Sequence, residues 1–170
     1  MRTTHALTLS ALLVATAAWQ REAGAGIASG GRALAEPVAI SITVGGKEYK
    51  VSGEGKCHHA PMASYYDMRA KMWSVEYSAE GKSGLTNLHL TAWRPLAGGA
   101  DQMSLSLQVG SADHRIDTVK KSQNVGSGTL TLKPKGQGGT FEINGKDEKG
   151  ATIKGTVECT TFSSPEAVAG

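Results

Sequence analysis

The feature that most constrains this 170-residue chain is a two-residue alternation of apolar and polar side chains. The clearest run holds Met103, Leu105 and Leu107, which are separated by serines. Alternation with this period places successive side chains on opposite faces of a β-strand. Further runs occupy residues 40–44, 49–51, 73–77, 88–92, 114–118, 130–132, 141–143 and 153–157. Each strand is therefore expected to face a core on one side and solvent on the other.

The turns between these runs are rich in glycine, of which the chain has 22. Gly45-Gly46 separates two alternating runs, and such a pair is typical of a two-residue hairpin, where both central positions need positive φ. The sequence thus predicts an all-β fold: an antiparallel β-sandwich, immunoglobulin-like or a partly open barrel, of about 7–9 short strands.

Two stretches do not alternate. Residues 56–71 are interpreted as the longest irregular stretch, in which Pro61 could begin a short helix because proline suits a first helical position. Residues 94–101 are expected to form a second loop. Trp73 and Trp93 lie on expected strands, where a role in the core is favoured.

The N-terminus has the order of a secretory signal peptide: Arg2, an apolar stretch over residues 7–14, and the small-x-small sequence Ala15-Thr16-Ala17. We expect a signal peptide over 1–17, a flexible lead-in over 18–36, a β-sandwich domain over 37–162 and a disordered tail over 163–170. Cleavage after Ala35 is the alternative. Export to the periplasm or the extracellular space follows, with no transmembrane segment after signal removal.

The charge pattern argues against a nucleic-acid partner. Of 18 basic and 15 acidic side chains, three arginines and one glutamate precede Glu36, which leaves 15 basic and 14 acidic ones. No cluster of Lys and Arg remains to neutralise a phosphate backbone.

The two cysteines, Cys57 and Cys159, are each placed by the alternation on a core-facing side near a strand end. In an exported chain they are most simply a structural disulfide, and their spacing excludes a CxxC redox motif. Free or metal-bound thiols are the alternative.

Cys57-His58-His59, with Met62 close behind, is the one cluster that suggests a cofactor. Imidazole and thioether ligands suit copper, so His58, His59 and Met62 form a candidate metal site. The competing interpretation makes the histidines solvent-side loop residues. Met62, Met68 and Met72 recur at helix-like spacing, which favours packing against the core.

No catalytic signature is present. No serine lies in Gly-x-Ser-x-Gly, Asp113-His114 is interpreted as an edge polar pair, and no pair of carboxylates suits acid/base chemistry. Tyr65 and Tyr66, in the expected irregular loop, are the candidate recognition residues.

The layout also resembles a known family. The stretch ISITVGGKEYKVSGEGKC, which ends at Cys57, and IKGTVEC, which ends at Cys159, resemble the two ends of the mycobacterial lipoprotein antigen family. The resemblance implies an exported β domain with a surface or envelope role and no catalytic residues. This chain lacks the family's lipidation cysteine after the signal.

Three functions follow as hypotheses. The first is an exported, non-enzymatic module of the envelope or extracellular space, structural or binding a macromolecule or envelope component through residues 56–71 and 94–101. The second is a periplasmic copper-binding protein that uses the loop of Cys57, His58 and His59. The third is a small secreted hydrolase.

Overall fold

The computed structural model describes residues 36–81 and 84–164, which form an all-β domain. Its strands are β1 (Glu36–Val44), β2 (Lys47–Tyr65), β3 (Met68–Ser78), β4 (Leu85–Pro95), β5 (Gln102–Val109), β6 (Ala112–Asp117), β7 (Ser127–Lys135), β8 (Gly138–Lys146) and β9 (Thr152–Cys159). They make one antiparallel sheet in the order β6-β5-β4-β3-β2-β1-β9-β8-β7. The antiparallel all-β prediction is confirmed, and the single, nearly closed sheet corresponds to the partly open barrel. The predicted signal peptide, nearly all of the lead-in, and residues 165–170 lie outside the described residues.

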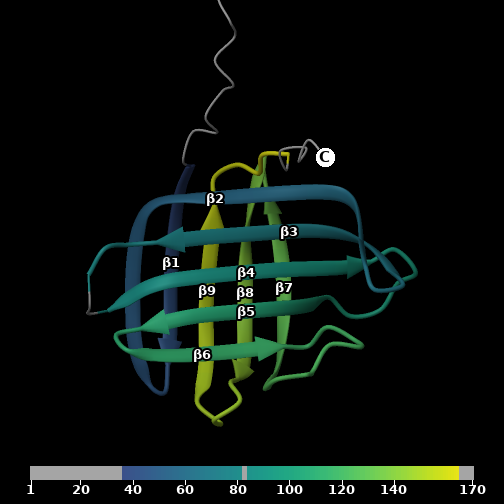
Figure 1. Ribbon diagram of the computed structural model, residues 1–170. Helices are drawn as coiled ribbons and strands as arrows, with labels where there is room; N and C mark the ends of the chain where they lie inside the picture. The colour runs from purple at the N-terminus through teal and green to yellow at the C-terminus, as the bar shows by residue number, and fades with distance from the viewer. Residues whose placement is uncertain (1–35, 82–83, 165–170) are drawn as a thin grey trace, which may run out of the picture. The chain divides into compact units, whose positions relative to one another are not determined.

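The sheet folds over itself into two layers whose strands run across one another (Figure 1). Strands β3 to β6 and the second half of β2 form the layer nearer the viewer, while β1, β9, β8 and β7 form the other. The glycine pair predicted to make a hairpin does so: Gly45 and Gly46 have φ of 56° and 88°, and Val44 pairs with Lys47. A long β2 is what carries the chain from one layer to the other.

Gly55 lies at this crossing: in the described part of the chain, it is the residue of β2 that pairs with both neighbouring strands, with Glu36 of β1 and Tyr77 of β3. A Cβ atom at this position would lie 2.6 Å from Cγ2 of Val38 and 2.8 Å from the carbonyl oxygen of Glu76. Only glycine lets the two strands approach so closely at the corner.

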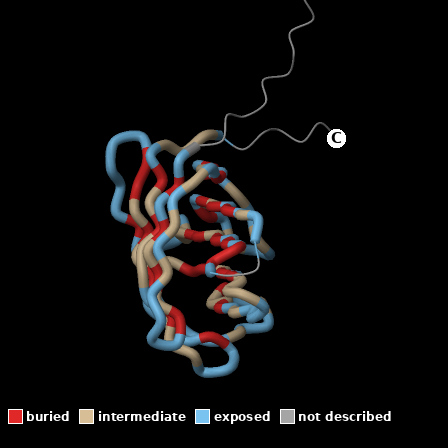
Figure 2. Tube along the Cα trace, turned by 90° about the vertical axis from the view of Figure 1, so that its left-hand side faces the viewer, coloured by how far each residue is buried: buried red, intermediate tan, exposed pale blue. Residues whose placement is uncertain are grey.

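The core lies between the two layers, where the buried positions gather (Figure 2). One side chain in two along each strand points inward, as the alternation predicts. The largest fully buried side chains are Phe141, Ile42, Leu88, Leu90, Met103, Leu105, Leu107, Ile116, Ile153, Val38, Val75 and Val119. Trp73 belongs to this core, whereas Trp93 belongs to a second, smaller buried cluster with Ala70 and Val119. The prediction that both tryptophans are buried is confirmed.

The predicted disulfide is present between Cys57 and Cys159, with a Cα–Cα distance of 6.2 Å and a sequence separation of 102 residues. Both cysteines are buried. Cys159 pairs with Val38 near the start of β1, while Cys57 lies just beyond the point where β2 leaves β1. The bridge therefore joins β2 to β9 across the corner where the layers meet.

The prediction of an irregular stretch over residues 56–71, with a short helix from Pro61, is wrong: β2 continues to Tyr65 and β3 begins at Met68, so these residues form a hairpin. The alternation is hidden because the register shifts between Ala60 and Ala63, which is a β-bulge. Met68 and Met72 are four residues apart, a spacing that shares a face in a strand as well as in a helix. Both are partly buried against the smaller cluster, but Met62 is 60% exposed.

Candidate functional site

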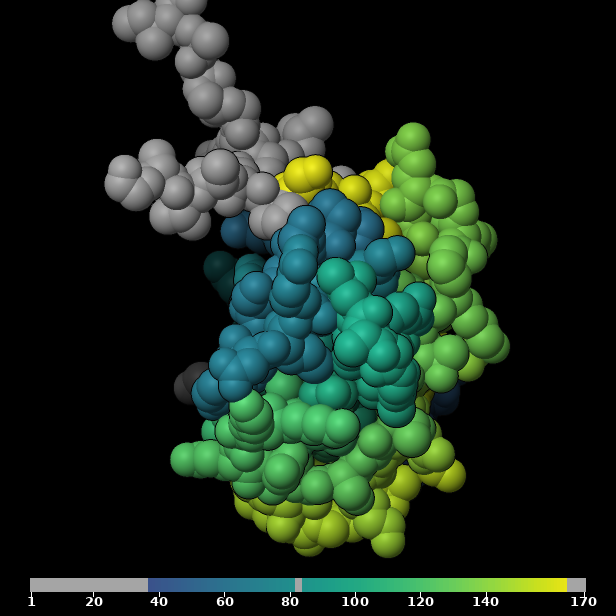
Figure 3. All heavy atoms as spheres, turned by 90° about the vertical axis from the view of Figure 1, so that its right-hand side faces the viewer, coloured from purple at the N-terminus to yellow at the C-terminus, as the bar shows by residue number. Residues whose placement is uncertain are grey.

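A large hollow lies where the ends of the front layer meet β7. We call it the edge cavity; its volume is about 1240 Å³, and residues 65–69, 95–102, 118, 120, 121 and 128–131 line it. Figure 3 shows this face, with the β4–β5 loop in teal between the blue end of the β2–β3 hairpin and the light-green β7. The cavity thus includes both predicted recognition tyrosines and most of the predicted second loop.

Tyr65 and Tyr66 are held differently although they are neighbours. Tyr65 ends β2 and is partly buried, with its ring centroid 5.0 Å from that of Trp93. Tyr66 meets Tyr65 edge-on at 4.6 Å and is 59% exposed. The φ of Tyr66 is 49°, a left-handed backbone that costs a residue with a Cβ roughly 1–2 kcal/mol. The hairpin thus presents an aromatic ring to solvent from a position where glycine would be less strained.

The electrostatics of Tyr65 suit hydrogen bonding rather than ionisation. Burial, followed by the hydrogen bond with Tyr66 and the charges of Tyr66 and Asp117, raises the pKa of Tyr65. The phenol therefore stays protonated across the ordinary pH range, at the wall of a largely apolar cavity.

The two carboxylates that line the cavity are paired. Asp101 receives two hydrogen bonds from Arg94, at 2.9 Å from Nε and 2.6 Å from Nη2, and Asp67 forms an ion pair with Lys121. The hydrogen bond from Lys121, and then its charge, lower the pKa of Asp67. The first pair joins the end of β4 to the β4–β5 loop, and the second, between two exposed side chains, joins the β2–β3 turn to the loop that follows β6.

Two cations of the cavity wall have no carboxylate partner within the described ranges. The Arg69 guanidinium donates only to Sδ of Met62, at 2.7 Å, and the Lys120 ammonium has no ion pair. Both side chains are exposed, while the backbone amide of Lys120 donates to Oε1 of Gln102. An apolar wall bordered by unpaired positive charge favours a ligand that is apolar in part and negatively charged in part.

The predicted metal ligands are not brought together. His58 and His59 are adjacent in a strand and therefore point to opposite faces of β2. The His59 ring stacks on Trp73 with centroids 4.7 Å apart, and burial followed by the charge of Lys71 lowers its pKa. Nε2 of His59 is buried without a partner. Among the residues that the structure describes, no three His, Cys, Asp or Glu side chains are grouped so that they could hold a metal ion.

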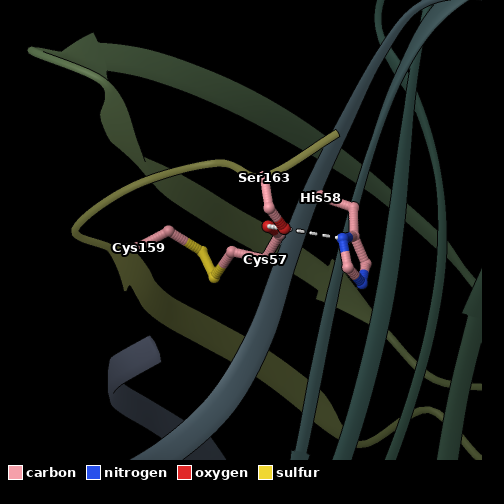
Figure 4. The surroundings of a disulfide bond; sticks show 4 residues. All are labelled: Cys57, His58, Cys159 and Ser163. Carbon is pink, nitrogen blue, oxygen red and sulfur yellow. Dashed lines mark hydrogen bonds between the residues drawn. A yellow bond between two sulfur atoms is a disulfide. The ribbon is translucent and has the colours of Figure 1, made fainter. Parts of the chain in front are cut away.

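His58 instead belongs to a set of bonds beside the disulfide (Figure 4). Its Nδ1 lies 2.9 Å from Oγ of Ser163, and that hydroxyl donates to the carbonyl oxygen of Cys57 at 3.0 Å. Because the single hydroxyl proton is used in this way, the ring nitrogen is the donor to Ser163. Backbone bonds from His59 to Ser163 and from Ser163 to Cys57 complete the contact. Ser163, the first residue of the predicted disordered tail, is therefore bonded to β2.

One polar pair escaped the sequence analysis. His114 of β6 contacts Asp147, in the turn between β8 and β9, and not its neighbour Asp113. The Asp147 side chain is fully buried and also accepts hydrogen bonds from the amides of Lys149 and Ala151. A sequence signal existed only for the turn, since aspartate commonly accepts from amides that follow it.

Comparisons of the chain with family models, with curated proteins and with solved structures gave no match. Within residues 36–81 and 84–164 there is no helix with the length and apolar character needed to cross a membrane.

Proposed function

We propose that this chain is an exported, non-enzymatic binding module that holds a protein partner at the edge cavity. The observation that carries the proposal is the cavity of about 1240 Å³ with the exposed, left-handed Tyr66 on its wall. Residues kept in an unfavourable backbone conformation cluster at functional sites, and exposed tyrosines are enriched among residues that dominate binding energy.

Two further observations support the proposal. The disulfide Cys57–Cys159 is compatible with an oxidising compartment outside the cytoplasm. The carboxylates of the cavity, Asp67 and Asp101, are each paired with a cation, so the apolar groups and the unpaired cations of the wall are left to contact a partner. A wall of this kind offers contact area and hydrogen bonds, which is what recognition requires.

A site-specific photocross-linking experiment tests the proposal. A photoreactive amino acid at position 66 is expected to capture one protein from the envelope and culture-medium fractions of the producing cells. The matched control carries the same group at position 47, at the β1–β2 turn, outside the cavity. Equal products from both positions, or none from position 66, would overturn the proposal.

A second arm separates binding from folding. Tyr66→Ala is expected to lower capture from a photoreactive group at position 96 at least about tenfold, since hot-spot aromatics commonly contribute 2 kcal/mol or more. The thermal unfolding midpoint should change little, because Tyr66 is exposed. Unchanged capture by the folded variant would show that the aromatic turn is not the contact.

A further inference from the structure

The strand β7 ends the sheet, and among the described strands its one neighbour is β8. Four consecutive residues of β7, Gly128 to Thr131, line the edge cavity. Successive side chains of a strand point to opposite faces, so a cavity that touches all four reaches the edge of the strand between its two faces. The edge cavity is therefore bordered by backbone groups of β7 that have no strand partner among the described residues.

The hairpin between β7 and β8 shows which backbone groups of β7 point outward. β7 and β8 are joined by the two-residue loop 136–137, and in such a hairpin the flanking residues Lys135 and Gly138 form a hydrogen-bonded pair. Every second residue back from Lys135, including Thr131 and Thr129, then bonds to β8. The amide and carbonyl groups of Leu130 and Gly128 consequently face the cavity.

Pro134 independently supports this assignment. A proline in a strand is confined to a position whose nitrogen faces away from the ladder, and Pro134 has the same parity as Gly128 and Leu130. It also limits the open edge, because Pro134 with the flanking Lys133 and Lys135 blocks strand pairing at that end. The stretch from Gly128 to Thr131 carries neither proline nor charge. The free edge of β7 is thus blocked at one end and open where it borders the cavity.

We propose that the occupant of the edge cavity is an extended peptide segment of the partner, which pairs with the free edge of β7 at Gly128 and Leu130. This inference rests on the proposed function and names its ligand class. Main-chain hydrogen bonds to the edge would give affinity, and alternate side chains would give specificity. β6, the other end of the sheet, does not line the cavity and carries exposed Asp113 and Arg115.

The wall of the cavity defines the peptide. Side chains on the inner side of the added strand would meet apolar groups, chiefly Leu130, Met68 and Leu96. Lys120 and Arg69, which lack carboxylate partners among the described residues, would attract an acidic side chain. The peptide is therefore extended, apolar at alternate positions and acidic near one end. An amphiphile with a carboxylate would satisfy the wall and the cations but would leave the β7 edge unpaired.

The test uses a displayed library of random 12-residue peptides, selected against the full chain. Selection is expected to enrich peptides with alternating apolar residues and at least one Asp or Glu. Lys120→Glu should weaken the best peptide about tenfold at low salt, while Lys47→Glu, outside the cavity, should not. Tyr66→Ala should also weaken it.

Amide hydrogen exchange decides between strand addition and other binding. A bound peptide should protect the Gly128 and Leu130 amides, which point outward, and leave Thr129 and Thr131, already bonded to β8, unchanged. If a peptide blocks the photocross-linking that Tyr66→Ala weakens but leaves these two amides unprotected, strand addition is wrong and the proposed function stands. If no peptide is enriched and an apolar carboxylate such as oleate binds instead, the peptide inference is wrong. If neither binds and position 66 captures nothing, the proposed function fails as well.

Discussion

Nδ1 of His114 lies 2.7 Å from Oδ2 of Asp147, and this contact joins β6, at one end of the sheet, to the β8–β9 turn on the other side of the opening. The Asp147 side chain is fully buried and that of His114 is 14% exposed. The pair therefore helps to hold the nearly closed sheet together at a place where none of the described strands pair.

Removal of this contact should destabilise the domain. His114→Ala leaves a buried carboxylate without its side-chain donor, and we expect the free energy of unfolding to fall by about 1–3 kcal/mol. Urea denaturation followed by tryptophan fluorescence measures it. His89→Ala is the matched control, since Nε2 of His89 lies 3.8 Å from Oε1 of Glu76 and both side chains are about half exposed. The control should lose at most about 0.5 kcal/mol, and equal losses would contradict a special role for the buried pair.

The stability that Asp147 provides should depend on pH. Burial alone would raise the pKa of Asp147, but the hydrogen bond from His114 and those from the amides of Ala151 and Lys149 outweigh it and lower the pKa. A lowered folded-state pKa means that the contribution is complete above the unfolded value, about 3.9, and is lost as the pH falls through the folded value. The advantage of the wild type over Asp147→Asn, measured by urea denaturation, should therefore be larger at pH 6 than at pH 3. A constant difference would show that the carboxylate charge is not involved.

Gly55 offers a test of the corner between the layers. Gly55→Ala is expected to cost about 1–3 kcal/mol, because its Cβ would overlap Val38 and the carbonyl oxygen of Glu76. Gly53→Ala is the control two residues away on the same strand, where the nearest atom to a new Cβ is Cε2 of Tyr77 at 3.4 Å. The thermal unfolding midpoint of Gly53→Ala should be close to that of the wild type. Similar midpoints for Gly53→Ala and Gly55→Ala would argue against a tight corner.

Loss of the disulfide should be the largest single perturbation. Its loop of 102 residues corresponds to about 4–5 kcal/mol in the chain-entropy model. The double variant Cys57→Ser/Cys159→Ser should have a free energy of unfolding lower by this amount, and so should the reduced wild type. Urea denaturation measures both. Mass spectrometry after alkylation, with and without reductant, reports the redox state of each sample. A reduced protein as stable as the oxidised one would contradict the expectation.

The strands were predictable because they depend on a short-range pattern, and the disulfide because the chain has two cysteines that this pattern places on the core-facing side. The alternation of Met103, Leu105 and Leu107 survives in β5, and both cysteines kept the expected inward side. The hairpin at Tyr65 and Tyr66 was misread because the bulge between Ala60 and Ala63 interrupts the period on which the prediction depends. The bulge is an adjustment to the path of β2, which no local signal encodes.

The site was only half predictable for a different reason. The tyrosines and the β4–β5 loop could be named from aromatic and turn chemistry, but their meeting with β7 depends on how the sheet closes. The same holds for His114 and Asp147, which are 33 residues apart and on separate hairpins. Contacts of this kind follow from topology, and alternation alone leaves the topology open.

The position of the disulfide sets how the domain would respond to tension along the chain. The described chain enters at Glu36 and leaves at Ser164, and Val38 pairs with Cys159 close to both ends. A pull on the two ends would load residues 36–57 and 159–164 and pass between them through the sulfur atoms. Residues 58–158 would be bypassed, and they contain every residue that lines the edge cavity. While the bridge is intact, β1 could be peeled away without drawing out the segment that forms the cavity.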